Sequence, residues 1–266
     1  RPSDVRRAIA NGADAVLVGT ALWQAVDMTL LYRQLSQARP VLKICGLTQA
    51  ADVALCLESG VDILGFVTDY PLPVPWNLAR EQAARLVETV RKSHRPGRSC
   101  LVTGGSPAAV VSLARELHPH LVQLHHQETL AETRQIAEAL KPLGIGVIQA
   151  IPGDPAARQA RYGTADTATA VEDLNQTGVY ALLADMRSPA NADQSGLVLD
   201  PAFCRSVVAH AAKPVMVAGG LTPERIEATV KATGTAFMDI MSGVEIRPGI
   251  KDPKRIRQAA EAMRHL

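Results

Sequence analysis

The stretch "VMVAGGLTPERI" (residues 215–226) joins a short apolar run to two glycines and then to residues that favour a helix. We interpret it as a buried strand, a tight turn and a helix with Thr222 as N-cap and Pro223 in the first helical position. "FMDIMSGVEIRPGIKD" (237–252) has the same order of strand, small residues and helix start. Helix N-termini bind anions, and glycine lets a phosphate approach the backbone. The two stretches predict a phosphate site at Gly219, Gly220, Ser242 and Gly243.

Eight short apolar runs of this kind occur along residues 41–266. They are Val41–Cys45, Ile63–Val67, Cys100–Val102, Leu121–Leu124, Gly146–Gln149, Tyr180–Ala184, Val215–Ala218 and Ala236–Ile240. Continuous apolar runs are typical of strands covered on both faces, and helical patterns alternate with them. This pattern predicts a (β/α)8 TIM barrel. The alternative, an open doubly wound sheet, would place a glycine-rich fingerprint after the first strand, whereas here the glycine turns come late.

Composition limits the classes of function. The chain has 266 residues, of which 47% are hydrophobic, enough for a large core. No apolar run approaches the roughly 18 residues of a membrane span, and the first residues lack the order of a signal peptide. The cysteines are widely spaced without a CxxC pair, which argues against a zinc site or a disulfide scaffold and favours a reducing cytoplasm.

The charge pattern does not favour a nucleic-acid partner. The formal net charge is +2, and the only dense basic run lies at 91–98. We interpret this run as a solvated loop between a helix and a strand, because 3% aromatic residues leave little for base stacking. We therefore expect neither a nucleic-acid nor a membrane partner.

Polar residues at the ends of the predicted strands mark a candidate active site. In a barrel of this class such side chains point into one mouth. Cys45 could act there as a base or nucleophile if Lys43 or a helix dipole lowers its pKa, or it could simply be a small buried hydrophobe. Asp185 follows an apolar run, and could be a general acid or the cap of the next loop. His125 and Asp239 also stand at strand ends and are expected at the same mouth.

Several motifs, in the same order and spacing, resemble phosphoribosylanthranilate isomerase of tryptophan biosynthesis. They are "KICGLT" (43–48), "GVDILGF" (60–66), "VQLH" (122–125), Asp185 with "SG" (195–196), "AGGL" (218–221) and "DIMSGVEIRPGIKD" (239–252). The resemblance covers residues 41–266 and implies a (β/α)8 barrel that catalyses an Amadori rearrangement of an aminated ribose phosphate. It implies a phosphorylated small-molecule substrate, no cofactor and no metal.

The resemblance also assigns roles to residues. It makes Cys45 the general base and Asp185 the general acid, acting from the first and sixth strands on opposite sides of the mouth. His125 matches a family histidine at the end of the fourth strand. Lys43 would favour the Cys45 thiolate, or would instead pair with a carboxylate such as Asp239.

The sequence departs from the family pattern near the substrate. Where the family has an arginine that holds the anthranilate carboxylate, alignment places Trp76, which can stack on a ring but cannot form a charged bidentate contact. Arg80 could reach back, although a place on the helix surface is the simpler expectation. His126 replaces a small residue beside the mouth. A divergent barrel acting on another phosphoribosyl-amine or sugar phosphate, or a non-catalytic phosphate-binding barrel, therefore stays open as an alternative.

Residues 1–37 do not fit the eight-strand count. They read as helix, strand and helix, and they resemble the C-terminal end of indole-3-glycerol-phosphate synthase. We therefore expect a remnant of that barrel at 1–37 and the isomerase barrel at 38–266. The chain would then be the isomerase half of a bifunctional fusion.

Overall fold

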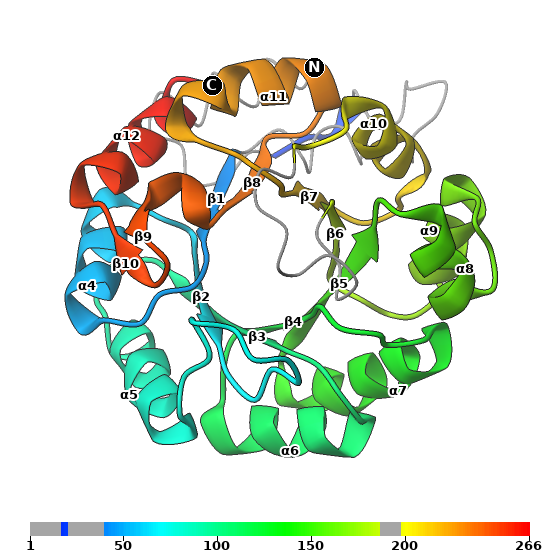
Figure 1. The fold of residues 1–266 in the computed structure, drawn as a ribbon, viewed down its shortest axis with the longest axis horizontal. Helices are drawn as coiled ribbons and strands as arrows, with labels where there is room; N and C mark the ends of the chain where they lie inside the picture. The colour runs from blue at the N-terminus through cyan, green and yellow to red at the C-terminus, as the bar shows by residue number, and fades with distance from the viewer. Residues whose placement is uncertain (1–16, 21–39, 187–197) are drawn as a thin grey trace.

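Eight parallel strands form a closed barrel in chain order, β1 to β8, in the computed structural model, which describes residues 17–20, 40–186 and 198–266 (Figure 1). The (β/α)8 prediction is confirmed, and each expected strand is present with its ends shifted by a few residues at most. The strands are β1 (Val41–Ile44), β2 (Ile63–Val67), β3 (Arg98–Thr103), β4 (Leu121–Leu124), β5 (Gly146–Pro152), β6 (Ala181–Asp185), β7 (Val215–Val217) and β8 (Phe237–Ile240).

Helices surround the barrel and bury their apolar faces against the outside of the strands (Figure 1). Local signals set their ends: Thr129 and Glu132 form a reciprocal capping box at the start of one helix, and Gly60 ends another with φ of 80°. The helices are α4 (Ala50–Ser59), α5 (Arg80–Arg91), α6 (Pro107–Leu117), α7 (Leu130–Leu140), α8 (Pro155–Tyr162), α9 (Thr167–Asn175), α10 (Pro201–His210), α11 (Ile226–Thr233) and α12 (Pro253–Arg264).

The two glycine turns differ in how far they follow the predicted helix starts. After β7, Thr222 is at the N-cap and Pro223 at the first position as predicted, but the first turn is a 3₁₀ turn, η3 (Pro223–Arg225), that precedes α11, and the Thr222 side chain makes no cap hydrogen bond. After β8, another 3₁₀ turn, η4 (Ser242–Val244), leads into the antiparallel hairpin of β9 (Glu245–Arg247) and β10 (Ile250–Lys251) instead of a helix. Pro248 and Gly249, which has φ of 78°, form the hairpin turn, so the "RPG" of residues 247–249 specifies a turn.

Strand alternation and register bring the polar residues of the mouth together. Along β1, the alternate positions 41, 43 and 45 face the barrel interior, and the parallel register sets Lys43 opposite Asp239 of β8. Below them, Ile63, Phe237 and their neighbours pack as an apolar interior cluster. The polar layer therefore rests on a packed apolar floor.

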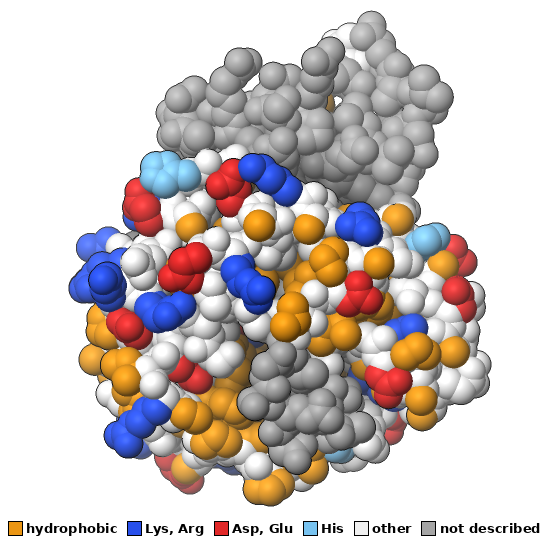
Figure 2. Space-filling model, turned by 45° about the horizontal axis from the view of Figure 1, so that its top comes forward, with side chains coloured by type: hydrophobic (Ala, Val, Ile, Leu, Met, Phe, Trp, Pro, Cys, Tyr) orange, Lys and Arg blue, Asp and Glu red, His pale blue; other side chains and the backbone are white. Residues whose placement is uncertain are grey.

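The expectation for residues 1–37 lies outside the described residues, apart from 17–20, so it stays a prediction. No helix in the described ranges has both the length and the apolar character needed to cross a membrane. Basic and acidic side chains are intermixed over the described surface visible in Figure 2.

Candidate active site

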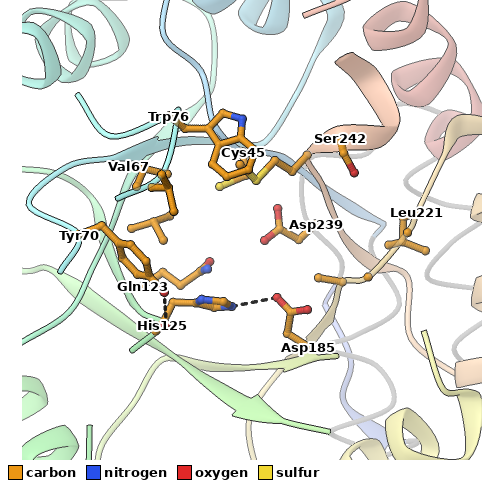
Figure 3. Close-up of a pocket in the computed structure, with 16 residues that line it drawn as sticks. Cys45, Val67, Tyr70, Trp76, Gln123, His125, Asp185, Leu221, Asp239 and Ser242 are labelled. Carbon is orange, nitrogen blue, oxygen red and sulfur yellow. Dashed lines mark hydrogen bonds and ion pairs between the residues drawn. The ribbon is translucent and has the colours of Figure 1, made fainter. Parts of the chain in front are cut away.

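A cavity of about 230 Å³ opens at the C-terminal ends of the barrel strands (Figure 3). The structure brings most of the predicted site residues together around it. Lys43 and Gly243 do not line the cavity: Lys43 is fully buried, and Gly243 packs against the neighbouring turn. The predicted residues that do line it are Cys45, Trp76, His125, Asp185, Gly219, Gly220, Asp239 and Ser242.

Cys45 sits directly after β1, with its thiol in the cavity wall. Burial raises the pKa of this thiol above its ordinary value of 9.0, and the charge of Lys43 offsets only part of that effect. Lys43 Nζ donates a hydrogen bond of 2.7 Å to Asp239 Oδ2, so the pairing with a carboxylate is the alternative that the structure supports. Lys43 lowers the pKa of the Cys45 thiol, as expected of a neighbouring cation, but burial raises this pKa by more than the lysine lowers it.

Asp239 extends from the middle of β8 into the cavity. Burial raises the pKa of its carboxyl group, while the charge of Lys43 opposes this rise. Asp239 Oδ2 accepts the hydrogen bond from Lys43, whereas Asp239 Oδ1 is buried without a hydrogen-bond partner among the described residues. The cavity therefore holds a buried acceptor that a bound hydroxyl group could satisfy.

Asp185 is the last residue of β6 and faces Cys45 across the cavity (Figure 3). His125 Nε2, from the end of β4, lies 2.9 Å from Asp185 Oδ2. Tyr70 donates its hydroxyl hydrogen bond to the His125 carbonyl oxygen at 2.8 Å, which fixes the backbone beneath the imidazole. A histidine in direct contact can hold the carboxyl group in place and exchange a proton with it.

The two glycine turns lie against each other beside Asp185. A methyl group on Gly243 would lie 1.8 Å from the Leu221 carbonyl oxygen, so only glycine permits this contact. Gly219 and Gly220 both have positive φ, at 112° and 62°. The turns after β7 and β8 therefore form one continuous edge of the cavity.

Sequence reasoning missed several cavity residues. Gln123 lies two positions before His125 on β4, so strand alternation sends both side chains inward, and a glutamine within an apolar strand was the available signal. Its Oε1 is buried and has no hydrogen-bond partner in the described part of the chain. The others are mostly apolar and carried no signal: Val67, Tyr70, Val74, Val102, Ala218, Leu221 and Met241.

The described residues contain no group of three or more His, Cys, Asp or Glu side chains placed to hold a metal ion. The four cysteines, all within the described ranges, are free and buried.

Comparison with known proteins identifies the family. The model of the N-(5'-phosphoribosyl)anthranilate (PRA) isomerase family matches residues 42–262. The N-(5'-phosphoribosyl)anthranilate isomerase of Rhodospirillum rubrum is 33% identical, over 84% of this chain and 97% of its own. The chain belongs to the PRA isomerase family.

Relatives and solved structures agree with this assignment. The PRA isomerase of a Caulobacter species is also 33% identical, over 84% of this chain and 98% of its own. The crystal structure of phosphoribosyl anthranilate isomerase from Thermotoga maritima superposes with a TM-score of 0.68 at 26% identity, covering 85% of this chain and all of that one.

The residues that depart from the PRA isomerase pattern occupy distinct places. Trp76 lines the cavity, whereas Arg80 is exposed and pairs with Asp69 and Glu116. The expectation that Arg80 lies on the helix surface is confirmed. His126 is not among the lining residues and packs edge-on to Tyr70, with ring centroids 6.2 Å apart.

Proposed function

We propose that this chain catalyses the Amadori rearrangement of N-(5'-phosphoribosyl)anthranilate to the carboxyphenylamino-deoxyribulose phosphate, an isomerisation step of tryptophan biosynthesis. One observation carries the proposal: Cys45 and Asp185 line opposite sides of one cavity, with the paired glycine turns at its edge. Membership of the PRA isomerase family supports it.

The two side chains divide the proton transfers between them. Asp185 donates a proton to the furanose ring oxygen, the bond from that oxygen to C1′ breaks, and a protonated imine forms. The imine acidifies the C2′ proton, which the Cys45 thiolate removes to give an enolamine. Tautomerisation then yields the amino-ketose, so one proton is donated, one is taken, and the atoms of the substrate are conserved.

The remaining polar groups of the cavity suit the rest of the substrate. We assign the phosphate to the turns at Gly219, Gly220 and Ser242, where glycine lets an anion come close to backbone N–H groups. The buried acceptors Gln123 Oε1 and Asp239 Oδ1 are suited to ribose hydroxyl groups, which would supply the hydrogen bonds they lack within the described chain.

The test is the loss of anthranilate-type fluorescence when freshly made PRA is mixed with the purified chain. Wild type should consume PRA and form the amino-ketose. Cys45→Ser should lose roughly a hundred- to ten-thousandfold in turnover, since a serine hydroxyl ionises far less readily than a thiol and supplies almost no anion to accept the proton. Cys56→Ser is the matched control, because Cys56 is equally buried but lies on α4 outside the cavity. Unchanged turnover in Cys45→Ser would refute the assigned role.

Two further parts of the proposal rest on sequence. Residues 1–37 are proposed to be the end of a preceding indole-3-glycerol-phosphate synthase barrel, which would make this chain the isomerase half of a fusion. The cytoplasm is its proposed location, in keeping with four unpaired cysteines.

A further inference from the structure

The cavity has two chemically different ends. At one end, the glycine turns and Ser242 offer backbone and hydroxyl groups. At the other, Cys45, Val67 and Val102 form a buried apolar cluster against which Trp76 and three other apolar or aromatic side chains pack. These three are Tyr70, Val74 and Met241. We call this end the aryl end; it lies around Cys45 in Figure 3.

The polar edge of Trp76 is engaged outside the cavity. Its Nε1–H donates a 3.0 Å hydrogen bond to Glu245 Oε1 in the β9–β10 hairpin. Glu245 in turn forms a buried ion pair with Lys251, whose Nζ lies 2.8 Å from the same oxygen. The indole is thus held by a buried, charged acceptor, and its carbon rings remain for contact with whatever enters the cavity.

A neighbouring glycine gives the indole room in this position. A Cβ at Gly46 would lie 3.1 Å from Trp76 Cδ1 and 2.9 Å from Met241 Cε. Gly46 also has φ of 70°, a conformation that side chains disfavour. The residue after Cys45 therefore leaves room for a fixed aromatic wall directly beside the thiol.

The aryl end lacks a fixed cation within the described part of the chain. The described residues that line the cavity include neither lysine nor arginine. The nearby lysines, Lys43 and Lys251, are buried in ion pairs with Asp239 and Glu245. Among the described residues, a carboxylate carried on an aromatic ring in this position would meet valine, tyrosine and indole surface.

We propose that Trp76 makes the aryl end a stacking site, so that the chain selects N-aryl phosphoribosylamines through the ring itself and gains little from a carboxylate on that ring. The inference rests on the proposed function for the phosphoribosylamine part of the substrate. It extends the substrate class from the anthranilate derivative to aryl amines without the carboxylate, such as the aniline derivative.

Calorimetry with two reduced product analogues tests this inference. One is reduced 1-(2-carboxyphenylamino)-1-deoxyribulose 5-phosphate, and the other is the same molecule with phenyl in place of carboxyphenyl. We expect wild type to bind the two with Kd values within about threefold of each other. A charged hydrogen-bonded partner would favour the carboxylated analogue by roughly ten- to a hundredfold. A preference of that size, or binding of neither analogue, would overturn the inference.

Variants at Trp76 test the stacking. Trp76→Leu should weaken the binding of both analogues equally, by roughly tenfold in Kd. Trp76→Phe should keep both Kd values within about threefold of wild type, because it retains an aromatic ring. Tyr180→Leu is the control, since it removes an aromatic ring outside the cavity. Weakening of the carboxylated analogue alone, or of neither, would contradict the role of Trp76. If Trp76→Leu folds poorly, the ratio of the two analogues' Kd values for wild type still tests the inference.

Failure of the proposed function gives a separate result. Wild type that binds both analogues equally but leaves PRA and its aniline counterpart unchanged would refute catalysis and support the aryl site. Turnover of PRA more than about thirtyfold better in kcat/KM than of the aniline counterpart would support catalysis and refute the aryl site.

Discussion

At the scale of single residues, the state of the Cys45 thiol decides how the site works. Its own strand supplies Lys43 two positions earlier, which from sequence alone suggests a stabilised thiolate. The fold directs that lysine to Asp239, and burial keeps the thiol pKa high. In the proposed mechanism, a neutral Cys45 thiol would first release its proton to solvent, and the protonated imine of the substrate would favour the resulting thiolate.

The pH dependence of alkylation tests this state of Cys45. Only the thiolate reacts with iodoacetamide, and burial raises the pKa of Cys45 above its ordinary 9.0. The modification rate at Cys45, measured by peptide mass spectrometry, should therefore still climb by about tenfold per pH unit between about pH 8 and 9.

The same cysteine in protein unfolded with guanidinium chloride supplies the reference, and its rate should level off at lower pH than that of the folded protein. A plateau in the folded protein below about pH 8 would contradict this account. It would mean that Lys43 holds a resting thiolate after all.

At the scale of elements, the pairing of β1 with β8 places a buried ion pair inside the barrel. Lys43 and Asp239 are opposite each other in register, and both side chains are almost wholly buried. A charge left alone at such a position is costly, whereas two apolar residues of similar volume can be tolerated. The register of β1 and β8 therefore places a charged pair beside the cavity, where Asp239 is one of the lining residues.

Stability measurements on this pair should be strongly non-additive. Lys43→Met should lower the free energy of unfolding by about 3–5 kcal/mol, because it leaves Asp239 buried and unpaired. The double variant Lys43→Met with Asp239→Leu should recover most of that loss in denaturant unfolding. Losses that simply add would show that the two residues do not act as a pair.

The contact between the two glycine turns gives a second prediction at this scale. Gly243→Ala would place a methyl group 1.8 Å from the Leu221 carbonyl oxygen. Forcing the turns apart should cost roughly 1–3 kcal/mol of stability and raise KM for the phosphorylated substrate. The measurements are thermal unfolding and steady-state kinetics.

Gly97→Ala is the control for this prediction. It adds a methyl group before β3, at the other end of the barrel, against the flexible side chain of Leu57. It should lower stability without changing KM. Equal KM values for the two variants would contradict a phosphate site at the turns.

At the scale of the whole molecule, the sequence was sufficient for the architecture. Eight continuous apolar runs separated by helical patterns admit few arrangements, and closure into a barrel brings the ends of all eight strands to one mouth. Motif order was sufficient for Cys45, Asp185 and His125 to be placed at that mouth, where the structure has them.

What sequence could not supply were contacts between distant segments. The partner of Lys43 lies 196 residues away along the chain, and the anchor of Trp76 lies 169 residues away. The helix predicted directly after β8 was wrong, because a helix and a 3₁₀ turn share the same first residues and this 3₁₀ turn leads into a strand. Apolar lining residues such as Val67 and Met241 look like any core residue until the cavity is seen.

The central claim is that Asp185 and Cys45 together rearrange PRA in this cavity, and the turnover of PRA by Asp185→Asn tests it most directly. Asp173→Asn is the control, because Asp173 is an exposed aspartate on α9, outside the cavity. Wild type and Asp173→Asn should consume PRA at the same rate, while Asp185→Asn, folded to the same melting temperature within a few degrees, should be slower by roughly a hundred- to ten-thousandfold. Equal rates in all three proteins would contradict the account.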